Sequence, residues 1–264
     1  MTKLGWMNVS DLSFNSLLLL EKIQISWLDR MNISQEDLAI AFSANPAVEW
    51  YIRNQCERLN PWLDNLLENV EVEDYSDAKV RAAEIEVMEN MNDWLVYVVD
   101  PSAYDSQPFL EWDSDELRDV ADFAGKTVID LGAGTGRLTF VAAEKAKTVY
   151  AVEPVGNLRD YIEEKAEKKG FTNIYTTDGL IEKIPFADDF ADIIIGGHVF
   201  GEYFEREYNE MIRVVKPGGR IVLCPGANDE ESERHQFLVD KGFNWSSFME
   251  PVDGMKRKYW KIVK

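Results

Sequence analysis

The residues best suited to chemistry lie in one short segment in the middle of the chain, VIDLGAGTG, which runs from Val128 to Gly136. An apolar run ends in Asp130, and Gly132, Gly134 and Gly136 follow at alternate positions. Glycine lets the backbone turn with positive φ and lets a ligand approach without a Cβ in the way. The next residues, RLTFVAAEKA, suit a helix, whose first N–H groups are free to bind an anionic or polar group. The segment therefore predicts a strand, a glycine turn and a helix that together cradle a nucleotide-type ligand.

The spacing of the glycines separates two kinds of cradle. Dinucleotide-binding sites usually have the spacing G-x-G-x-x-G. Here the third glycine comes one residue early, and Asp130 stands two residues before the first. Four further segments follow in order: VYAVEP from Val149, TTDG from Thr176, IPFADDFADIIIGGHVF from Ile184 and EMIRVVKPGGRIVL from Glu210.

The glycine segment resembles motif I of the class I S-adenosylmethionine (SAM)-dependent methyltransferases, and the four later segments resemble that family's second, third, fourth and fifth strand regions. The resemblance implies a Rossmann-like α/β fold with a seven-stranded, mostly parallel sheet whose last strand is antiparallel. It also implies SAM as the cofactor and S-adenosylhomocysteine as its product. The implied cofactor-binding residues are Asp130, Leu131, Gly132, Ala133, Gly134, Gly136, Glu153, Pro154, Asp178, Gly179, Leu180 and Gly197.

Three acidic residues receive specific roles from this resemblance. Asp130 orders the amino group of the cofactor, Glu153 accepts hydrogen bonds from the ribose hydroxyls, and Asp178 accepts from the adenine amino group while the N–H of Gly179 caps the ring. Simpler roles stay open for two of them. Glu153 also suits a solvated acid at a strand end, and a dinucleotide enzyme uses an acid at the same place. Asp178 also suits a helix N-cap.

Four residues are candidates for the acceptor pocket. His198 follows the fourth strand, and the ordinary pKa of histidine suits a general base near neutral pH; a wall of the pocket is the alternative role. Tyr104, Glu111 and Trp112 lie ahead of the glycine segment. They either cover the cofactor and acceptor or attach the helical region to the core. His235, in a highly charged stretch, is expected at the surface.

The apolar pattern divides the chain into an N-terminal all-helical region and an α/β region. We expect residues 1–100 to be a helical accessory or substrate-cap region, 101–125 a linker and cofactor lid, and 126–264 the SAM-binding core. A long helix is expected over Asp11 to Met31, and another from Ala78 to Val99 after an N-cap at Ser76. The predicted strands are 127–131, 148–152, 172–176, 191–196 and 219–224, followed by two terminal strands joined at Asp253-Gly254. The predicted helices between them are 136–146, 156–169 and 203–215.

Composition and net charge limit the kinds of binding partner that we expect. The net charge is −20, and residues 1–115 carry 7 Lys and Arg against 22 Asp and Glu. Such a surface repels nucleic-acid phosphates and anionic membranes, so neither partner is expected. Two cysteines are too few for a disulfide framework or a metal cluster, so no metal is expected, and Cys224 suits a buried small side chain. With no secretory or membrane-spanning pattern, we expect a cytoplasmic protein. The sequence does not define the oligomeric state.

These observations predict a SAM-dependent methyltransferase that moves the methyl group to a small-molecule acceptor by in-line displacement. The acidic surface disfavours a nucleic-acid acceptor, while a protein acceptor stays open. The alternatives are a non-catalytic SAM-binding regulator that uses its helical region for protein interaction, and a Rossmann oxidoreductase. The lid hypothesis places Tyr104, Glu111 or Trp112 opposite His198 across the acceptor pocket.

Overall fold

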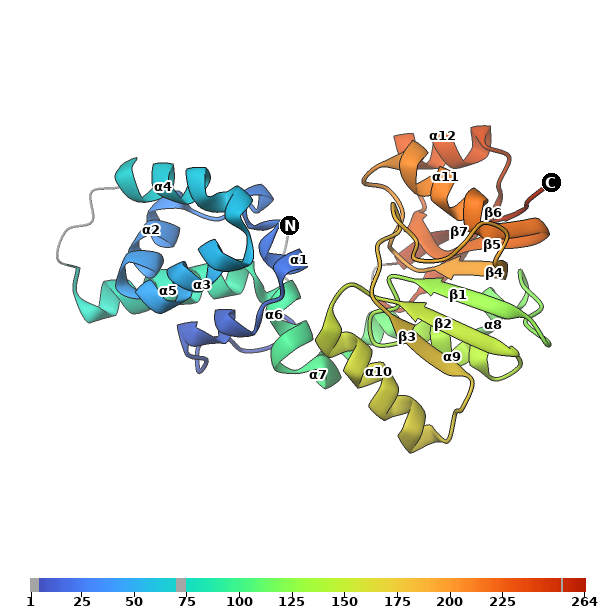
Figure 1. Cartoon of the computed structure of the whole chain (residues 1–264), viewed down its shortest axis with the longest axis horizontal. Helices are drawn as coiled ribbons and strands as arrows, with labels where there is room; N and C mark the ends of the chain where they lie inside the picture. Colours follow the sequence, from blue (N-terminus) through green and yellow to red (C-terminus); the bar gives the residue numbers. More distant parts are fainter. Residues whose placement is uncertain (1–4, 70–74, 253) are drawn as a thin grey trace. The chain divides into compact units, whose positions relative to one another are not determined.

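The computed structural model describes residues 5–69, 75–252 and 254–264, and the chain divides into two compact units, Met1–Tyr104 and Asp105–Lys264 (Figure 1). The predicted linker therefore contributes residues 101–104 to the first unit and 105–125 to the second. The roles predicted for the linker and the helical region, a lid and a cap, stay predictions. None of the helices in the described residues has both the length and the apolarity that crossing a membrane requires.

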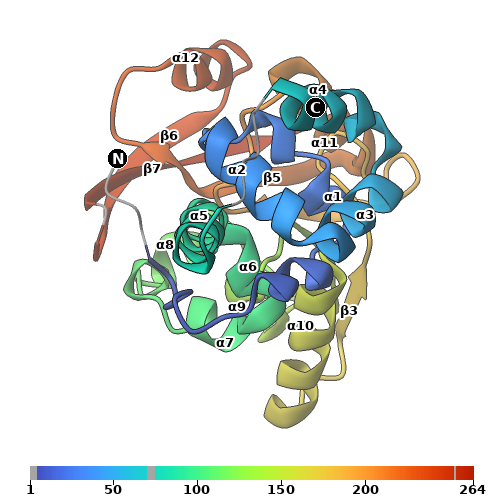
Figure 2. The same ribbon diagram turned by 90° about the vertical axis from the view of Figure 1, so that its left-hand side faces the viewer.

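All regular secondary structure in the described residues of the first unit is helical, as predicted. Its helices, with α7 reaching the boundary, are η1 (Phe14–Leu19), α1 (Lys22–Ile25), η2 (Leu28–Arg30), α2 (Gln35–Ala44), α3 (Pro46–Gln55), η3 (Glu57–Leu59), α4 (Asn60–Asn69), α5 (Asp77–Asn90), α6 (Asn92–Val99) and α7 (Pro101–Asp105). Helix α2 packs against α3 and α5 (Figure 2). Fully buried Phe14, Leu17, Phe42, Ile52 and Leu63 lie in its core.

The two long helices predicted for this unit are both broken. The stretch from Asp11 to Met31 forms short turns, because Leu20 adopts an extended conformation and Glu21 caps a new helix, α1, with a reciprocal capping box. The second helix does begin after Ser76, whose hydroxyl accepts from the N–H of Lys79. It ends at Met91, where the backbone leaves helical geometry before α6 starts. Apolar spacing alone did not reveal these interruptions.

The second unit contains one seven-stranded sheet with strand order β3-β2-β1-β4-β5-β7-β6. Strands β1 to β5 are parallel, and β7 runs antiparallel between β5 and β6. The strands are β1 (Thr127–Leu131), β2 (Thr148–Val152), β3 (Ile174–Thr177), β4 (Ala191–Gly196), β5 (Val215–Asn228), β6 (Asn244–Glu250) and β7 (Gly254–Ile262). The predicted fold class is confirmed. The predicted turn at Asp253-Gly254 includes Asp253, which lies outside the described residues.

Helices cover both faces of this sheet (Figure 1). The helical segments of the unit are η4 (Pro108–Leu110), α8 (Asp115–Arg118), α9 (Arg137–Ala143), α10 (Gly156–Lys169), α11 (Phe204–Val214) and α12 (Glu233–Asp240). Helices α8 and α9 share a core with Val128, Ile195 and Val222, while α11 and α12 pack on the opposite face against Ile129 and Ile194. Alternate residues of β1 thus enter opposite cores, which explains why both Val128 and Ile129 are apolar.

The predicted boundaries of strands and helices agree best with the structure where the apolar runs are short and end sharply. Strands β1, β2 and β4 and helix α10 occupy the residues predicted. Strand β3 begins two residues later than predicted. Strand β5 is longer at both ends, because Val215 pairs with Ala191 of β4 at its start and Asn228 pairs with Lys256 of β7 at its end. Helix α9 ends at Ala143, earlier than predicted.

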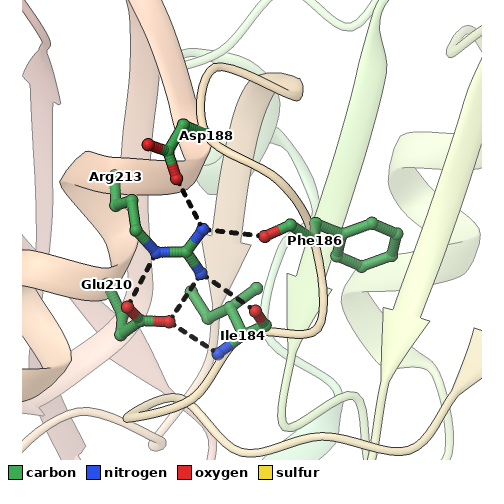
Figure 3. A network of polar contacts seen from close by, with 5 residues as sticks. All are labelled: Ile184, Phe186, Asp188, Glu210 and Arg213. Carbon is green, nitrogen blue, oxygen red and sulfur yellow. Dashed lines mark hydrogen bonds and ion pairs between the residues drawn. The ribbon is translucent and has the colours of Figure 1, made fainter.

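A polar network fixes the long connection between β3 and β4 (Figure 3). Arg213 of α11 donates to both oxygens of Glu210, to Asp188, and to the carbonyl oxygens of Ile184 and Phe186 at 2.7–3.0 Å. Glu210 also accepts from the N–H of Ile184 at 2.9 Å. The network lowers the pKa of the Glu210 carboxyl through its hydrogen bonds with Arg213. The connection after Asp178 is therefore held against α11 by directional bonds.

Candidate functional site

The strand order reverses between β1 and β4, at the centre of the parallel part of the sheet. Loops at the carboxyl ends of strands form ligand sites at such a reversal. Val199, in the loop after β4, packs against both strand ends, because a Cβ on Gly132 or on Gly196 would lie 2.7 Å from its side chain. The glycine loop after β1 and the loop that carries His198 are therefore neighbours.

The glycine loop has the backbone conformation that its sequence predicts. Gly132, Gly134 and Gly136 all have positive φ, between +56° and +85°. Gly136 is the N-cap of α9, and a Cβ there would lie 2.9 Å from the Phe140 ring. Packing and conformation therefore both require glycine at this position. The loop turns tightly from β1 into the N-terminus of α9, as the nucleotide-type cradle predicts.

Asp130 is buried beneath this loop. Its carboxylate accepts from the hydroxyl of Thr139 at 2.5 Å and from the Thr139 N–H. Thr139 is the third residue of α9, so the carboxylate satisfies one of the free N–H groups at the helix start. Burial raises the pKa of Asp130 from 3.8 to about 7, against the lowering effect of the hydrogen bonds. In this structure the carboxylate supports the helix; its predicted contact with the cofactor amino group stays a prediction.

Glu153 joins the end of β2 to the glycine loop. One carboxylate oxygen accepts from the N–H of Gly134 at 2.9 Å, and the other accepts from the N–H of Val155 at 2.9 Å. The side chain is buried rather than solvated, which removes the simpler role of a solvent-exposed acid. The Glu153 carboxylate is thus held in place beside the glycine loop.

Asp178 follows β3, and its side chain is 78% exposed, with Arg159 at 3.8 Å. No helix forms in residues 178–190, so the alternative role as a helix N-cap is excluded. Arg159 also donates to the carbonyl oxygen of Glu153 at 2.6 Å, which links the ends of β2 and β3. A Cβ on Gly179 would lie 2.7 Å from Pro185, so close packing requires glycine there. Leu180 follows in a single bridge with Lys183.

His198 has a φ of +56°, which is unusual for a residue with a side chain and costs on the order of 1 kcal/mol. Its N–H donates to the carbonyl oxygen of Pro225 at 2.8 Å. Its Nε2 lies 3.3 Å from a carboxylate oxygen of Glu250, which is fully buried at the end of β6. The other oxygen of Glu250 lies 3.3 Å from Nζ of Lys256. The ring is thus oriented by a buried acid, while 43% of the His198 side chain stays exposed.

The loop after His198 is fixed by a second acid that the sequence did not single out. Glu207 of α11 is buried, and its carboxylate accepts from the N–H groups of Gly201, Glu202 and Tyr203 at 2.6–2.9 Å. Its signal in the sequence is weak, because an acid in the first turn of a helix is common. Glu250 had no signal beyond its place in the terminal strand pair.

The segment from Asp105 to Arg118 is attached to helices α9 and α10. Lys165 donates to both oxygens of Asp105 at 2.6–2.7 Å and to the carbonyl oxygen of Thr135 at 3.2 Å. Arg137 donates to the carbonyl oxygens of Leu110 and Trp112 at 2.7 Å. The segment is therefore tied both to the glycine loop and to the start of α9.

The predicted pocket residues ahead of β1 lie in different environments. Trp112 is 3% exposed and packs on Phe248, with its ring centroids 5.6 Å apart, so its side chain contributes to the core. Glu111 is exposed. Tyr104 belongs to the helical unit, where its ring contacts Tyr97 at 5.0 Å. The lid role and the attachment role of these residues both stay predictions, because the contact of Trp112 with Phe248 lies within the second unit.

The predicted environments of His235 and Cys224, which lie outside the cradle, can be compared with the structure. His235 was expected at the surface, which is wrong: it is 6% exposed, and its Nδ1 lies 3.1 Å from the hydroxyl of Tyr259. The charged stretch around it forms α12, whose inner face buries the ring against β7. Cys224 is fully buried, as predicted, and burial raises the pKa of its thiol to about 12.

The cradle fits the cofactor that the sequence implies. The glycine loop, Glu153 and Asp178 lie at the ends of three adjacent strands, in the order in which the resemblance assigns them to methionine, ribose and adenine. The hydroxyl of Thr135, within the loop, is buried and has no hydrogen-bond partner among the described residues. Among the remaining predicted residues, Leu131 and Ala133 are buried in the core, Pro154 is partly exposed after Glu153, and Gly197 packs on Leu138.

Known proteins are similar in sequence to the α/β part of the chain. The methyltransferase domain family matches residues 122–257, just over half of the chain. An uncharacterized methyltransferase of Geobacillus thermodenitrificans is 31% identical over 149 residues, which cover 54% of this chain and 66% of that protein. The protein YafE of Escherichia coli is 33% identical over 94 residues, covering 35% of this chain and 45% of YafE. Matches to these relatives thus span less than two thirds of their length.

A solved structure of a SAM-dependent methyltransferase from Aquifex aeolicus is 22% identical, with a TM-score of 0.48, and the match covers 62% of this chain and 99% of that one.

The match of the domain family to residues 122–257 shows that the chain belongs to the methyltransferase family. This agrees with the class I SAM-dependent methyltransferases that the glycine segment resembles, whose cofactor is SAM. The predicted family is confirmed.

The raised pKa of Asp130 predicts a dependence of stability on pH. Because the folded-state pKa is about 7 and the usual value is 3.8, the stability that this group contributes is present below pH 4 and lost as pH rises to 7. At about 1.4 kcal/mol per pKa unit, the loss is on the order of 4 kcal/mol. Asp130→Asn should abolish this loss, so the wild type should become less stable relative to the variant as pH rises from about 5.5 to 8.

The measurement is the free energy of opening of the sheet unit, taken from hydrogen exchange of β1 in both proteins at each pH. Exposed Asp119 supplies the control, because Asp119→Asn should follow the wild type across the range. A constant difference between the wild type and Asp130→Asn would show that Asp130 does not titrate in this window.

Proposed function

We propose that the protein transfers a methyl group from SAM to a small-molecule acceptor, and that His198 removes a proton from the acceptor. The observation that carries the proposal is the cradle. Glu153 accepts a hydrogen bond from the N–H of Gly134 in the glycine loop at 2.9 Å, and the neighbouring loop carries His198, whose ring is oriented by Glu250. When bound, SAM supplies an activated methyl group on a sulfonium, which an acceptor atom takes by in-line displacement. The chain itself then contributes binding, alignment and proton removal.

The cofactor-binding part of the proposal assigns each strand end one portion of SAM. The glycine loop with Asp130 and Thr139 beneath it holds the methionine portion. Glu153 lies at the end of β2 for the ribose hydroxyls, and its bonds to the N–H groups of Gly134 and Val155 fix its orientation beside the glycine loop. Asp178 is exposed at the end of β3 and is free of any helix-capping role, so it suits the adenine amino group.

The proton-transfer part depends on His198 and Glu250. A general base needs its ring nitrogen aimed at the acceptor and its other nitrogen held by a partner. Glu250 lies 3.3 Å from Nε2, so Nδ1 is the nitrogen left to receive the proton. As the acceptor atom bonds to the methyl carbon and the bond from that carbon to sulfur breaks, the acceptor proton passes to His198. Glu250 then stabilises the imidazolium and acts as a positioning residue.

The acidic charge of the chain supports a small-molecule acceptor over a nucleic acid. A net charge of −20 would repel a phosphate backbone, whereas a small acceptor meets only the side chains at the site. Localisation in the cytoplasm and the state of assembly stay outside this proposal.

The first test of the proposal is SAM binding. Glu153→Gln and Asp178→Ala should each weaken SAM by roughly 1.5–3 kcal/mol, because each removes a charged hydrogen-bond acceptor. Isothermal calorimetry on the full chain measures the affinity. Glu164→Gln is the matched control, because this exposed acid of α10 pairs with Lys168 of the same helix and should leave the affinity for SAM unchanged. Binding of NAD without binding of SAM would overturn the cofactor assignment, and an unchanged affinity in either variant would remove that residue from the site.

The second test concerns proton removal. With a small-molecule extract as the source of acceptor, His198→Gln should lower kcat for S-adenosylhomocysteine formation by about 10² or more. Glu250→Gln should lower kcat less, since the ring is retained but not oriented. Neither variant should change the KM for SAM, whereas general damage to the fold would. Exposed Glu205 provides the control variant Glu205→Gln.

Two results would contradict this proposal. Full activity of His198→Gln would exclude the ring as the base. Tight SAM binding with no turnover in any extract would favour the alternative function, a SAM-binding regulator that acts through protein interaction.

A further inference from the structure

A cavity of about 400 Å³ opens beside His198 in the α/β unit. His198 lines it from the loop after β4 and Phe204 from the start of α11. Ala227 and Asn228 line it from the end of β5, and Ser232 and Arg234 from the start of α12. The base proposed above and the guanidinium of Arg234 therefore face one space. Under the proposed function this space is where an acceptor would lie, so its charge bears on the acceptor's chemistry.

The position of Arg234 is built into the backbone. Its guanidinium lies against Gly201, where a Cβ would be 2.6 Å from Nη2. Gly201 has a φ of +134°, a conformation that side chains disfavour. The loop that approaches Arg234 is the one held by Glu207, whose carboxylate accepts from the N–H of Gly201 at 2.7 Å. The backbone at Gly201 thus lies against one side of the Arg234 guanidinium, and Arg234 lines the cavity.

Arg234 also lacks an acidic partner in the part of the chain that the structure describes: its contact is a long hydrogen bond of 3.4 Å from Nη1 to the carbonyl oxygen of Gly226. Two nearby acids of the same connection, Asp229 and Glu231, pair with Arg257 at 2.7 and 3.1 Å. A guanidinium without a carboxylate is notable in a chain with a net charge of −20. It offers the planar fork that binds a carboxylate through two parallel hydrogen bonds.

We propose that the acceptor carries a carboxylate, which Arg234 binds while His198 takes the proton from the nucleophilic hydroxyl or amine of the same molecule. This inference rests on the proposed function and names its substrate class. Exposed Glu230 and Glu233 also line the cavity. They would repel a phosphate ester, which is close to a dianion at neutral pH, more than a carboxylate with a single charge. The chemistry of the cavity therefore selects a carboxylic acid over a phosphorylated metabolite.

The test uses the full chain, SAM and a small-molecule extract separated by anion exchange at neutral pH, with S-adenosylhomocysteine formation as the readout. Acceptor activity should be retained on the exchanger, survive treatment with alkaline phosphatase, and disappear when carboxylates are converted to amides. Arg234→Gln should raise the amount of the active fraction needed for half-maximal rate by about 10- to 100-fold, and Arg234→Lys by less. The KM for SAM should stay unchanged in both, which shows that the variants are folded.

Arg206→Gln is the matched control, because this exposed arginine of α11 lies outside the cavity and makes the same change in net charge. Activity in the unretained fraction, activity that amidation leaves intact, or an Arg234→Gln variant that behaves like the wild type would each overturn the carboxylate assignment while leaving methyl transfer in place. Loss of activity after phosphatase treatment would assign a phosphate instead. Absence of turnover with every fraction would overturn the proposed function and this inference together.

Discussion

The loops at the carboxyl edge of the sheet leave backbone N–H groups without strand or helix partners, and buried carboxylates supply those partners. Asp130 accepts from Thr139, Glu153 from Gly134 and Val155, and Glu207 from three consecutive residues of the loop after β4. A buried N–H group without an acceptor would cost free energy comparable to a lost hydrogen bond. The shape of the proposed cofactor and acceptor sites therefore depends on acids that point inward.

This arrangement has an electrostatic consequence at its centre. Three hydrogen-bonded or buried acids surround the strand reversal, and burial raises the pKa of Asp130 to about 7. A cationic ligand group beside these carboxylates would stabilise their charged forms. SAM carries both an ammonium and a sulfonium, so the acidic cradle and the proposed cofactor are complementary in charge. The single unpaired guanidinium of the cavity, that of Arg234, is then the feature that distinguishes the acceptor end from the cofactor end.

The sequence predicted those parts of the molecule whose signals are local. The glycine loop, strands β1, β2 and β4, helix α10 and the terminal strand pair follow from apolar runs and turn residues that lie next to one another. The broken helices of the first unit were missed because Leu20 and Met91 keep the apolar period while their backbones leave the helix. Periodicity reports which face is buried and says little about interruptions.

The candidate site could be predicted only where one residue lies at a strand end. Glu153 and Asp178 were proposed as site residues in this way, but their contacts with Gly134 and Arg159 were not predicted. Glu250 and Arg234 had no signal, because each acquires its partners from a segment distant in the sequence: Glu250 reaches His198 from β6, and Arg234 reaches Gly201 from α12. Contacts of this kind depend on the tertiary fold, as does the burial of His235.

The central claim is that the edge formed by the glycine loop, Glu153 and His198 is one methyl-transfer site. A crystal structure of the full chain with S-adenosylhomocysteine tests it most directly. The account predicts the ribose at Glu153, the adenine at Asp178, and the sulfur facing the cavity that His198 and Arg234 line. A cofactor bound away from the glycine loop, or a sulfur directed away from His198, would contradict it.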